Sequence, residues 1–347
     1  MAAKVKRSRM KKTGSKKKTD VIRVEDLSPP RSYSLEVSGI TQSLVKKWLL
    51  CKRAFLLSVN KYESRAGKKS YAFGSLVHEV LDKLYKYAEL HARKRPVGIL
   101  SDLEEMIPIW IDDYILKNRK KDLRAKSHDE LETDAAKAEA LLIEYVYTFA
   151  DDFKLKKFHG IEEVSEVDFN GTILRKKQDG KYYDKNGKLW LMEHKTKGKI
   201  VEESIMMALK MDFQNLWYCY MEQLLTGERV YGVLYNVIRT PGHKVHVNES
   251  IKEYKERLRD LIREDPAHFF KRYPVTYTKK DLNEFGRELY MILSEIKSKL
   301  KYPRFLIRST PHCLMSFPCD FLKACSCGNM NDFKKRRELF PELVEEE

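Results

Sequence analysis

The chain has 347 residues, of which 42% are hydrophobic and 34% are charged, so it is long enough to bury one large core or two modest ones beneath a heavily solvated surface. A formal net charge of +16 favours a polyanionic partner, nucleic acid first. No stretch approaches the length and apolarity of a membrane span, and no apolar region follows the basic N-terminus, so we expect a soluble cytoplasmic protein without a secretory signal.

The N-terminal segment is the most strongly charged part of the sequence. The first 19 residues hold nine Lys or Arg and no acid, which predicts a disordered basic arm, serving nucleic-acid contact or only solubility and localisation. Residues 20–35 carry Pro29-Pro30 and little periodicity, so residues 1–35 are read as an arm and linker. A single folded domain is then predicted over residues 36–330, and a charged tail over 331–347.

The first half of this domain, residues 36–158, is predicted to be mainly helical. Capping residues followed by apolar positions at helical spacing predict helical segments over residues 38–57, 75–93, 101–118 and 128–155. The last two are charged and amphipathic, as a helical layer or insertion would be.

The pattern changes near Gly160 to short strands. Residues 164–169 alternate as a strand does, residues 171–174 follow, and residues 188–192 read as a short buried strand. A helix over 202–225, a strand over 230–238 and helices over 249–264 and 280–300 come next. This order predicts an α/β fold with a mixed central sheet flanked by helices, in which residues 159–240 form the sheet and its helix, 241–300 a helical part and 301–330 a cysteine-rich region.

Candidate chemistry lies in the hairpin of residues 174–197, LRKKQDGKYYDKNGKLWLMEHKTK. Side chains alternate along a strand, so Glu193 and Lys195 share one face, while the backbone carbonyl of His194 stays close to them. Asp179 faces them across the hairpin, and two carboxylates on neighbouring strands can hold a divalent cation for phosphodiester cleavage. A solvated strand end is the alternative reading of the same residues.

Three further residues accompany this hairpin. Gln214 and Tyr218 stand four positions apart on the following helix and therefore share one face. Upstream, residues 74–81, GSLVHEVL, place His78 within an apolar helix, where a lone histidine is otherwise an ordinary core residue.

With these residues the sequence resembles the RecB-like branch of the PD-(D/E)xK nuclease superfamily, close to CRISPR-associated exonucleases with an iron–sulfur cluster and to their phage homologues. The G-x-x-x-H-E-x-L motif matches residues 74–81, and the G-x-[ID]-type strand matches Gly171 to Asp179 more loosely. The [DE]-x-K-T motif matches residues 193–196, and Q-x-x-x-Y matches Gln214 to Tyr218. The resemblance covers roughly residues 38–330 and implies a restriction-endonuclease-like core.

The resemblance also implies roles for individual residues. Asp179 and Glu193 would bind Mg²⁺ or Mn²⁺, assisted by His78 and the His194 carbonyl, and Lys195 would act on the attacking water. Gln214 and Tyr218 would position DNA or the water. Glu166 is a possible auxiliary, although a surface carboxylate is the alternative for it.

Cysteines gather near the end of the sequence as C-x5-C-x5-C-x-C, a spacing that differs from the C-x2-C pairs of common zinc sites. The resemblance implies a 4Fe–4S cluster held by Cys51, Cys313, Cys319 and Cys325, with Cys327 as a spare or an alternative to Cys325. Zinc, or unliganded thiols, remain the alternatives. Cys219 is expected to be a small core residue.

Two functions from different classes follow. The first is a metal-dependent DNA nuclease, an exonuclease acting on single strands or duplex ends in recombination, repair or phage DNA metabolism, with recombination or replication proteins as candidate partners. Aromatic residues such as Trp217, Tyr231 and Tyr235 would stack on bases or lie in the core. The second is a non-catalytic nucleic-acid-binding or assembly subunit that keeps the nuclease fold. An incomplete site would distinguish the second from the first.

Overall fold

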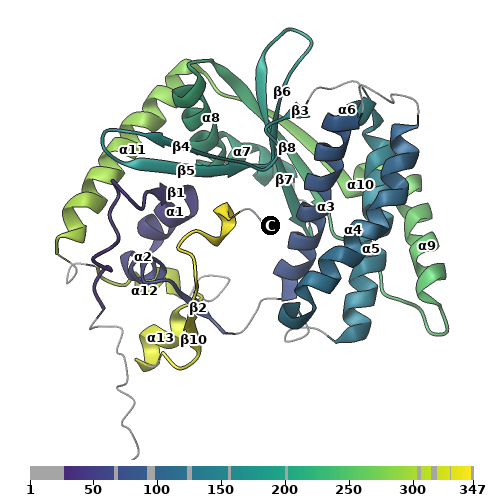
Figure 1. Ribbon diagram of the computed structural model, residues 1–347, viewed down its shortest axis with the longest axis horizontal. Coiled ribbons are helices and arrows are strands. Elements are labelled where there is room, and N and C mark those ends of the chain that lie inside the picture. The colour runs from purple at the N-terminus through teal and green to yellow at the C-terminus, as the bar shows by residue number, and fades with distance from the viewer. Residues whose placement is uncertain are drawn as a thin grey trace, which may run out of the picture.

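The computed structural model describes residues 27–65, 69–91, 98–122, 127–154, 158–199, 202–302, 306–313, 319–328 and 330–344 (Figure 1). Residues 1–26, which hold most of the predicted basic arm, and the acidic residues 345–347 lie outside this set.

A five-stranded sheet forms the centre of the fold, in the strand order β3-β6-β7-β8-β9. Its strands are β3 (Phe158–His159), β6 (Gly180–Tyr183), β7 (Leu189–Lys197), β8 (Val230–Arg239) and β9 (Phe270–Thr276). β7 and β8 run parallel, whereas the other neighbours are antiparallel. The mixed sheet and the α/β class predicted from the sequence are therefore confirmed.

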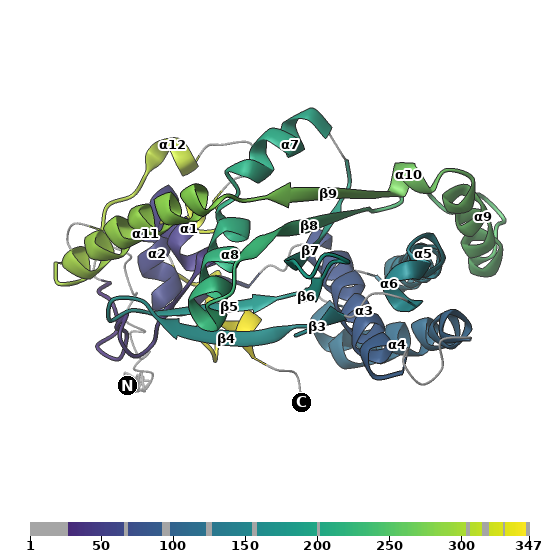
Figure 2. The same cartoon turned by 90° about the horizontal axis from the view of Figure 1, so that it is seen from above.

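A second sheet of three strands, in the order β1-β5-β4, lies beside the first. It contains β1 (Ile40–Thr41), β5 (Ile173–Gln178) and β4 (Glu163–Asp168). β5 continues into β6 through a single residue, Asp179, so the two sheets meet at that position (Figures 1 and 2).

Each face of the central sheet is covered by a separate hydrophobic cluster, because successive side chains of β7 point to opposite faces. Leu189 and Leu191 pack with α1 (Gln42–Leu50), α2 (Lys52–Val59), α8 (Phe213–Thr226) and α11 (Lys279–Leu300). Trp190 and Met192 pack with α3 (Lys69–His91), α4 (Ile99–Asp122), α5 (His128–Thr148) and α9 (Ile251–Glu264). Figure 2 shows these two groups of helices on either side of the strands. Three shorter helices are α6 (Ala150–Lys154), α7 (Glu202–Lys210) and α10 (Pro266–Phe269).

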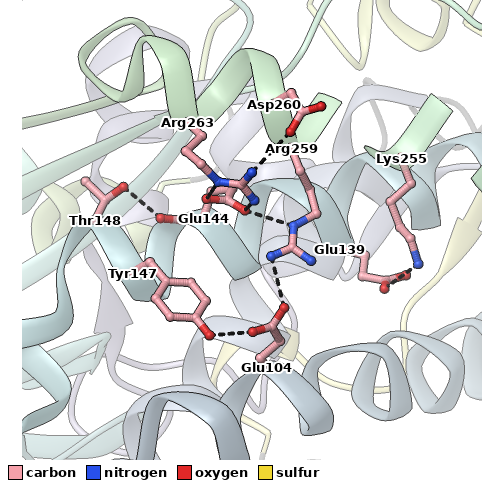
Figure 3. A network of polar contacts seen from close by, with 9 residues as sticks. All are labelled: Glu104, Glu139, Glu144, Tyr147, Thr148, Lys255, Arg259, Asp260 and Arg263. Carbon is pink, nitrogen blue, oxygen red and sulfur yellow. Dashed lines mark hydrogen bonds and ion pairs between the residues drawn. The ribbon is translucent and has the colours of Figure 1, made fainter. Parts of the chain in front are cut away.

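The helix α9 is fastened to the helical layer by ion pairs (Figure 3). Arg259 donates to the buried carboxylate of Glu144 on α5 at 2.8 Å and pairs with Glu104 on α4 at 2.9 Å. Arg263 pairs with the same Glu144 carboxylate at 2.9 Å. Glu144 with two arginines therefore joins α9 to α5, and Glu104 joins α9 to α4.

A third cluster joins the two ends of the described chain. β2 (Tyr62–Ser64) pairs with β10 (Phe333–Lys335), and Tyr62 and Phe333 pack with residues of α2 and α13 (Leu322–Cys327). α12 (Thr310–Cys313) precedes this cluster, and the short 3-10 helix η3 (Pro341–Leu343) follows it. Residues 330–344, most of which we set apart as a charged tail, thus contain a strand and a helical turn.

Several details of the secondary structure differ from the sequence prediction. The helices predicted over residues 128–155 and 202–225 are each two helices, α5 with α6 and α7 with α8. The helical stretch predicted over residues 38–57 is two helices, because Cys51 has an extended backbone with φ −161° and ψ 112°. The strand β9 was not predicted, because it reads FKRYPVT and mixes charges with a proline. Such a sequence suits an edge strand, and among the described strands β9 pairs with β8 alone.

Candidate active site

A cleft of about 1500 Å³ runs along β5 between α3 and α1. His78, Asp179 and Tyr218 line it, together with residues of α1, β4 and residues 339–344. The structure thus brings three residues that the sequence singled out, from three different elements, to one cavity.

Glu193 lies at the centre of the predicted group, on β7. Its side chain is 2% exposed, and its Oε1 atom accepts hydrogen bonds from Lys195 Nζ and from Gln214 Nε2, the latter at 2.6 Å. Gln214 also donates to the Tyr218 hydroxyl at 3.2 Å, one helical turn away on α8. Four residues of the prediction therefore form one hydrogen-bonded chain.

Asp179 joins this group from the connection between β5 and β6. Its Oδ2 atom accepts a hydrogen bond from the backbone N–H of His194 at 2.5 Å. The pairing of Gly180 with Met192 brings the start of β6 beside β7 and so places Asp179 next to the residues after Met192. The acid predicted to lie across the hairpin does lie there.

The two acidic groups are electrostatically unusual. Burial raises the pKa of Glu193 to about 7, against the opposing charge of Lys195 and with a further rise from Asp179. Burial likewise raises the pKa of Asp179 to about 7, helped by the negative charge of Glu162. The ionisation of both neighbouring carboxyl groups is unfavourable, and a bound cation would stabilise the ionised pair.

The two carboxylates have the oxygen chemistry that a hard divalent cation prefers, whereas His78, Asp179 and Glu193 do not have ligand atoms that all lie within 4.8 Å of one another. Glu193 Oε2 is buried and has no hydrogen-bond partner in the described part of the chain. A buried carboxylate oxygen without a hydrogen-bond partner destabilises the folded protein, and coordination to a metal ion would offset this cost. Together with the Asp179 carboxylate, it would offer oxygen ligands of the kind that Mg²⁺ and Mn²⁺ prefer.

His78 approaches this group from α3. Its ring centroid lies 6.3 Å from that of His194, and its pKa is lowered first by burial and then by the charge of Lys195. A neutral imidazole at this position retains a nitrogen lone pair for a metal. The close approach of α3 depends on Gly74, where a Cβ atom would stand 2.9 Å from Thr196 Oγ1 on β7.

The imidazole of His194 points to the opposite face of β7, into a buried polar network that the sequence did not indicate. Asn236 Nδ2 donates to His194 Nδ1 at 2.7 Å and to the Tyr145 hydroxyl at 2.8 Å, while Asn236 Oδ1 accepts from Arg272 Nε at 3.2 Å. Because Nδ1 accepts, the ring proton of His194 is on Nε2. Burial lowers the pKa of His194 well below its ordinary value, so the ring is neutral.

This network extends across the helical layer. Arg272 also contacts Asp152 at 2.5 Å and the Tyr145 hydroxyl at 2.9 Å, and Tyr85 donates to Asp152 at 2.9 Å. The network therefore fixes the position of His194 from the face of β7 opposite Glu193. The backbone N–H of His194 is the group that binds Asp179. Its members come from α3, α5, α6, β8 and β9, so no local pattern in the sequence could have identified them.

Two charged residues near the site were also missed. Lys46 on α1 is half-buried, and its pKa is lowered by burial although the negative charges of Asp212 and Glu193 oppose that shift. Glu162 has a left-handed backbone, with φ 54°, and forms an ion pair with Lys177 at 2.5 Å. Both residues change the electrostatics of the site from separate elements.

Other residues named from the sequence take no part in this hydrogen-bonded group, although Tyr235 lies next to Glu193 on the neighbouring strand. Glu166 pairs with Arg175 at 2.8 Å with its side chain 59% exposed, as a surface carboxylate would. Trp217 and Cys219 are completely buried in α8, so they belong to the core. Tyr235 is also buried, on β8.

Four of the six cysteines come together beside α2 and α13. Cys51 Sγ accepts from the backbone N–H of Ser309 at 3.4 Å, and Cys313 Sγ donates to the carbonyl of the same residue at 3.4 Å. Cys319 and Cys325 pack against the hydrophobic cluster that contains Cys51. Burial raises the pKa of the Cys319 and Cys325 thiols, and the charges of Cys51 and Cys313 add to that rise.

The spacing of these sulfur atoms bears on the kind of ligand. Four thiolates on one tetrahedral zinc ion stand about 3.8 Å apart, since each Zn–S bond is about 2.3 Å long. Among the described residues, no three cysteines lie within 4.8 Å of one another, and the one metal-like group at that spacing is the exposed set His128, Asp129 and Glu132. The cysteines are therefore spaced more widely than a zinc site requires. Cys327 is exposed and outside the group.

Comparison with known proteins agrees with this geometry. A family model described as the PD-(D/E)XK nuclease superfamily matches residues 40–326. No curated protein matches the chain. In the described part of the chain, none of the helices has the length and apolar character needed to span a membrane.

Proposed function

Because the chain belongs to the PD-(D/E)XK nuclease superfamily, we propose that it is a metal-dependent deoxyribonuclease that acts as an exonuclease on single strands or duplex ends. The observation that carries this proposal is the proximity of Glu193 and Lys195 to Asp179, which lines the cleft, with Glu193 Oε2 buried and without a hydrogen-bond partner in the described part of the chain. A surface strand end would have solvated all three groups.

In the proposed site, Asp179 and Glu193 hold Mg²⁺ or Mn²⁺, with His78 and the His194 carbonyl as further ligands. The bound ion supplies Lewis-acid polarisation of the phosphate and a more acidic water. Gln214 orients the Glu193 carboxylate through its 2.6 Å hydrogen bond, and Tyr218 in turn orients Gln214. These two side chains can also position the substrate at the cleft wall, which Tyr218 lines.

Lys195 contributes charge in this proposal. Burial lowers the pKa of Lys195, but the charges of Glu193 and Asp179 outweigh this effect and raise it above the ordinary value. Lys195 therefore keeps its proton at neutral pH in the metal-free protein. Its ammonium group orients the attacking water and stabilises the negative charge that develops on the phosphate.

The test uses end-labelled single-stranded DNA, duplex DNA and RNA with Mg²⁺, Mn²⁺ or EDTA. We expect metal-dependent cleavage of DNA, and a loss of about 100-fold or more in rate for Glu193→Gln and Lys195→Gln. Lys185→Gln, at the exposed tip of the same hairpin, is the matched control and should keep the wild-type rate. Mn²⁺ binding by calorimetry should be lost in Glu193→Gln.

Retention of full cleavage by both site variants would refute the proposed catalytic site. DNA binding without cleavage under any metal condition would favour the other candidate, a nucleic-acid-binding or assembly subunit. The hydrogen-bonded group of Glu193, Lys195, Gln214 and Tyr218 beside Asp179 favours the enzyme over that alternative.

We further propose that Cys51, Cys313, Cys319 and Cys325 hold a 4Fe–4S cluster. Cys51 and Cys313 contact Ser309, and Cys319 and Cys325 pack against the hydrophobic cluster that contains Cys51, which supports this ligand set. The cluster would connect α2 to the α12–α13 region and so close the nuclease core. Zinc is the less favoured ligand.

Visible absorption with iron and sulfide analysis tests the cluster. Wild-type protein purified without oxygen should absorb in the visible region, and Cys51→Ser should lose this absorption. Cys327→Ser is the matched control and should keep it, because Cys327 is exposed. Zinc in place of iron would refute the cluster, and loss of absorption in Cys327→Ser would refute the ligand set.

The proposed setting follows from the proposed substrate. A DNA exonuclease of this kind would serve recombination, repair or phage DNA metabolism in the cytoplasm of a bacterium, archaeon or phage-infected cell, beside recombination or replication proteins. The formal net charge of +16 supports a nucleic-acid substrate in such a setting.

A further inference from the structure

Residues 339–344 lie inside the cleft of the candidate active site. They line it together with His78 and Asp179, and η3 lies against β5, where the last part of the ribbon in Figure 1 runs beside α1. Leu339 and Phe340 pack against the hydrophobic cluster of β5, α1 and α8. This C-terminal segment therefore forms part of the wall of the cleft.

The side chain of Glu342 binds two hydroxyl groups in this cleft. Its Oε1 atom accepts hydrogen bonds from Ser43 Oγ at 3.1 Å and from Thr41 Oγ1 at 3.3 Å. Thr41 is the N-cap residue of α1 but makes no capping hydrogen bond with its side chain. The carboxylate thus lies at the N-terminus of α1, the positive end of the helix dipole, where the Thr41 side chain makes no capping hydrogen bond.

Two cationic side chains border the same place. Lys47 follows Ser43 by one turn of α1, and Arg336 comes from the segment after β10; both are half-buried and line the cleft. Arg336 Nε has no hydrogen-bond partner in the described part of the chain. The pKa of Lys47 is lowered by burial and then by Arg336, while Glu342 opposes that shift. Glu342 and Asp320 supply negative charge near Lys47, and Arg336 Nη2 donates to the Ser58 carbonyl at 3.3 Å while its Nε atom stays unpaired.

The position of the Glu342 carboxylate and the proposed metal site lie at different points along β5. Thr41 of β1 pairs with Arg175 of β5, and Arg175, Lys177 and Asp179 share the face of β5 whose side chains are partly exposed. Four residues of strand separate Arg175 from Asp179, a length of about 13 Å. Both sites therefore face one cleft within the reach of a few nucleotides. Arg175 and Lys177, which lie along this strand, form ion pairs with Glu166 and Glu162.

We propose that Thr41, Ser43, Lys47 and Arg336 form a subsite for a backbone phosphate of the nucleic-acid strand that enters the active site, and that Glu342 occupies this subsite as an internal competitor when substrate is absent. The chemistry of the site favours a phosphate, because hydroxyl donors, cations and a helix N-terminus all recognise oxyanions. This inference rests on the proposed nuclease function only for the identity of the ligand. A tethered carboxylate competes at a high effective concentration, so nucleic acid must displace it.

The test is a binding measurement in EDTA, where no cleavage takes place, with fluorescein-labelled oligothymidylate and anisotropy as the readout. Glu342→Gln should bind about fivefold or more tightly than wild type, because an amide competes less well for the cations. The slope of log affinity against log salt should steepen by about one, for one additional phosphate contact. Glu338→Gln, an equal change of charge at an exposed position outside the cleft, is the matched control and should stay within about twofold of wild type.

A second variant tests whether the hydroxyl groups are the shared partner. When combined with Glu342→Gln, Ser43→Ala should remove most of the increase in oligonucleotide affinity. In the wild-type background, where the Ser43 hydroxyl is bound to Glu342, Ser43→Ala should change the affinity less. Thermal melts verify that each variant is folded. The inference fails if Glu342→Gln binds no more tightly than Glu338→Gln, or if Ser43→Ala leaves the gain intact.

The outcomes separate this inference from the proposed function. If wild type cleaves DNA but Glu342→Gln binds as wild type does, the subsite is wrong and the nuclease stands. If no cleavage occurs but the predicted pattern of affinities appears, the subsite stands on a binding protein. If no variant binds the oligonucleotide, both are wrong.

Discussion

Replacing Asp179 with asparagine is expected to stabilise the metal-free protein above pH 7. The carboxyl group of Asp179 is held beside Glu193, and burial raises the pKa of each to about 7. Asparagine keeps an oxygen that can accept the His194 N–H hydrogen bond but removes the charge. The substitution therefore removes a repulsion that only a bound cation would otherwise relieve.

The magnitude follows from the pKa of Asp179. The rise from an ordinary value near 3.9 to about 7 corresponds to an upper limit of about 4 kcal/mol, at about 1.4 kcal/mol for each pH unit. Asp179 is only half-buried, so screening by solvent reduces the expected gain to about 1–2 kcal/mol.

The pH dependence has a definite sign. Between about pH 4 and pH 7 the native protein binds more protons at Asp179 than the unfolded chain does, so the free energy of unfolding of wild type falls as pH rises through this window. The stability of Asp179→Asn lacks this contribution. The two proteins should therefore be similar near pH 4 and should differ most above pH 7.

Urea denaturation at pH 4, 6 and 8 in EDTA measures this difference, and the same series with Mg²⁺ should reverse the order, because wild type binds the ion more tightly. Glu284→Gln on the exposed face of α11 is the control and should change little. An equal gain at all three pH values, or no gain at pH 8, would refute the electrostatic reasoning.

Three further changes probe the framework of the site, each by urea denaturation. Glu222→Gln should cost about 3–5 kcal/mol, because it leaves Lys176, which is 1% exposed, without its counter-ion; a cost below about 1 kcal/mol would contradict this. Gly232→Ala should cost about 3 kcal/mol, because a Cβ atom would stand 2.1 Å from a backbone oxygen of β9, whereas Gly198→Ala meets open space and should be nearly neutral. Asn236→Leu should cost about 2–4 kcal/mol and slow cleavage as well, since it removes the hydrogen-bond partner of His194 Nδ1 and of Arg272 Nε; an unchanged rate would show that the network does not position the site.

Local periodicity is what the sequence by itself determined. The alternation in β7 places Glu193 and Lys195 on one face, and the spacing of Gln214 and Tyr218 places them on one turn of α8. These relations follow from the geometry of a single strand or helix, which near neighbours decide. The α/β class and the mixed sheet followed in the same way, from the order of such segments.

Relations between distant segments were decided only by the tertiary structure. The register of β6 against β7 brings Asp179 to the His194 N–H, and five separate elements build the network behind His194. Residues 339–344, which read as a charged tail, enter the cleft and place Glu342 on the first turn of α1. The reason is physical: such contacts depend on which surfaces pack together, and a polar residue has the same local pattern whether it meets solvent or a buried partner.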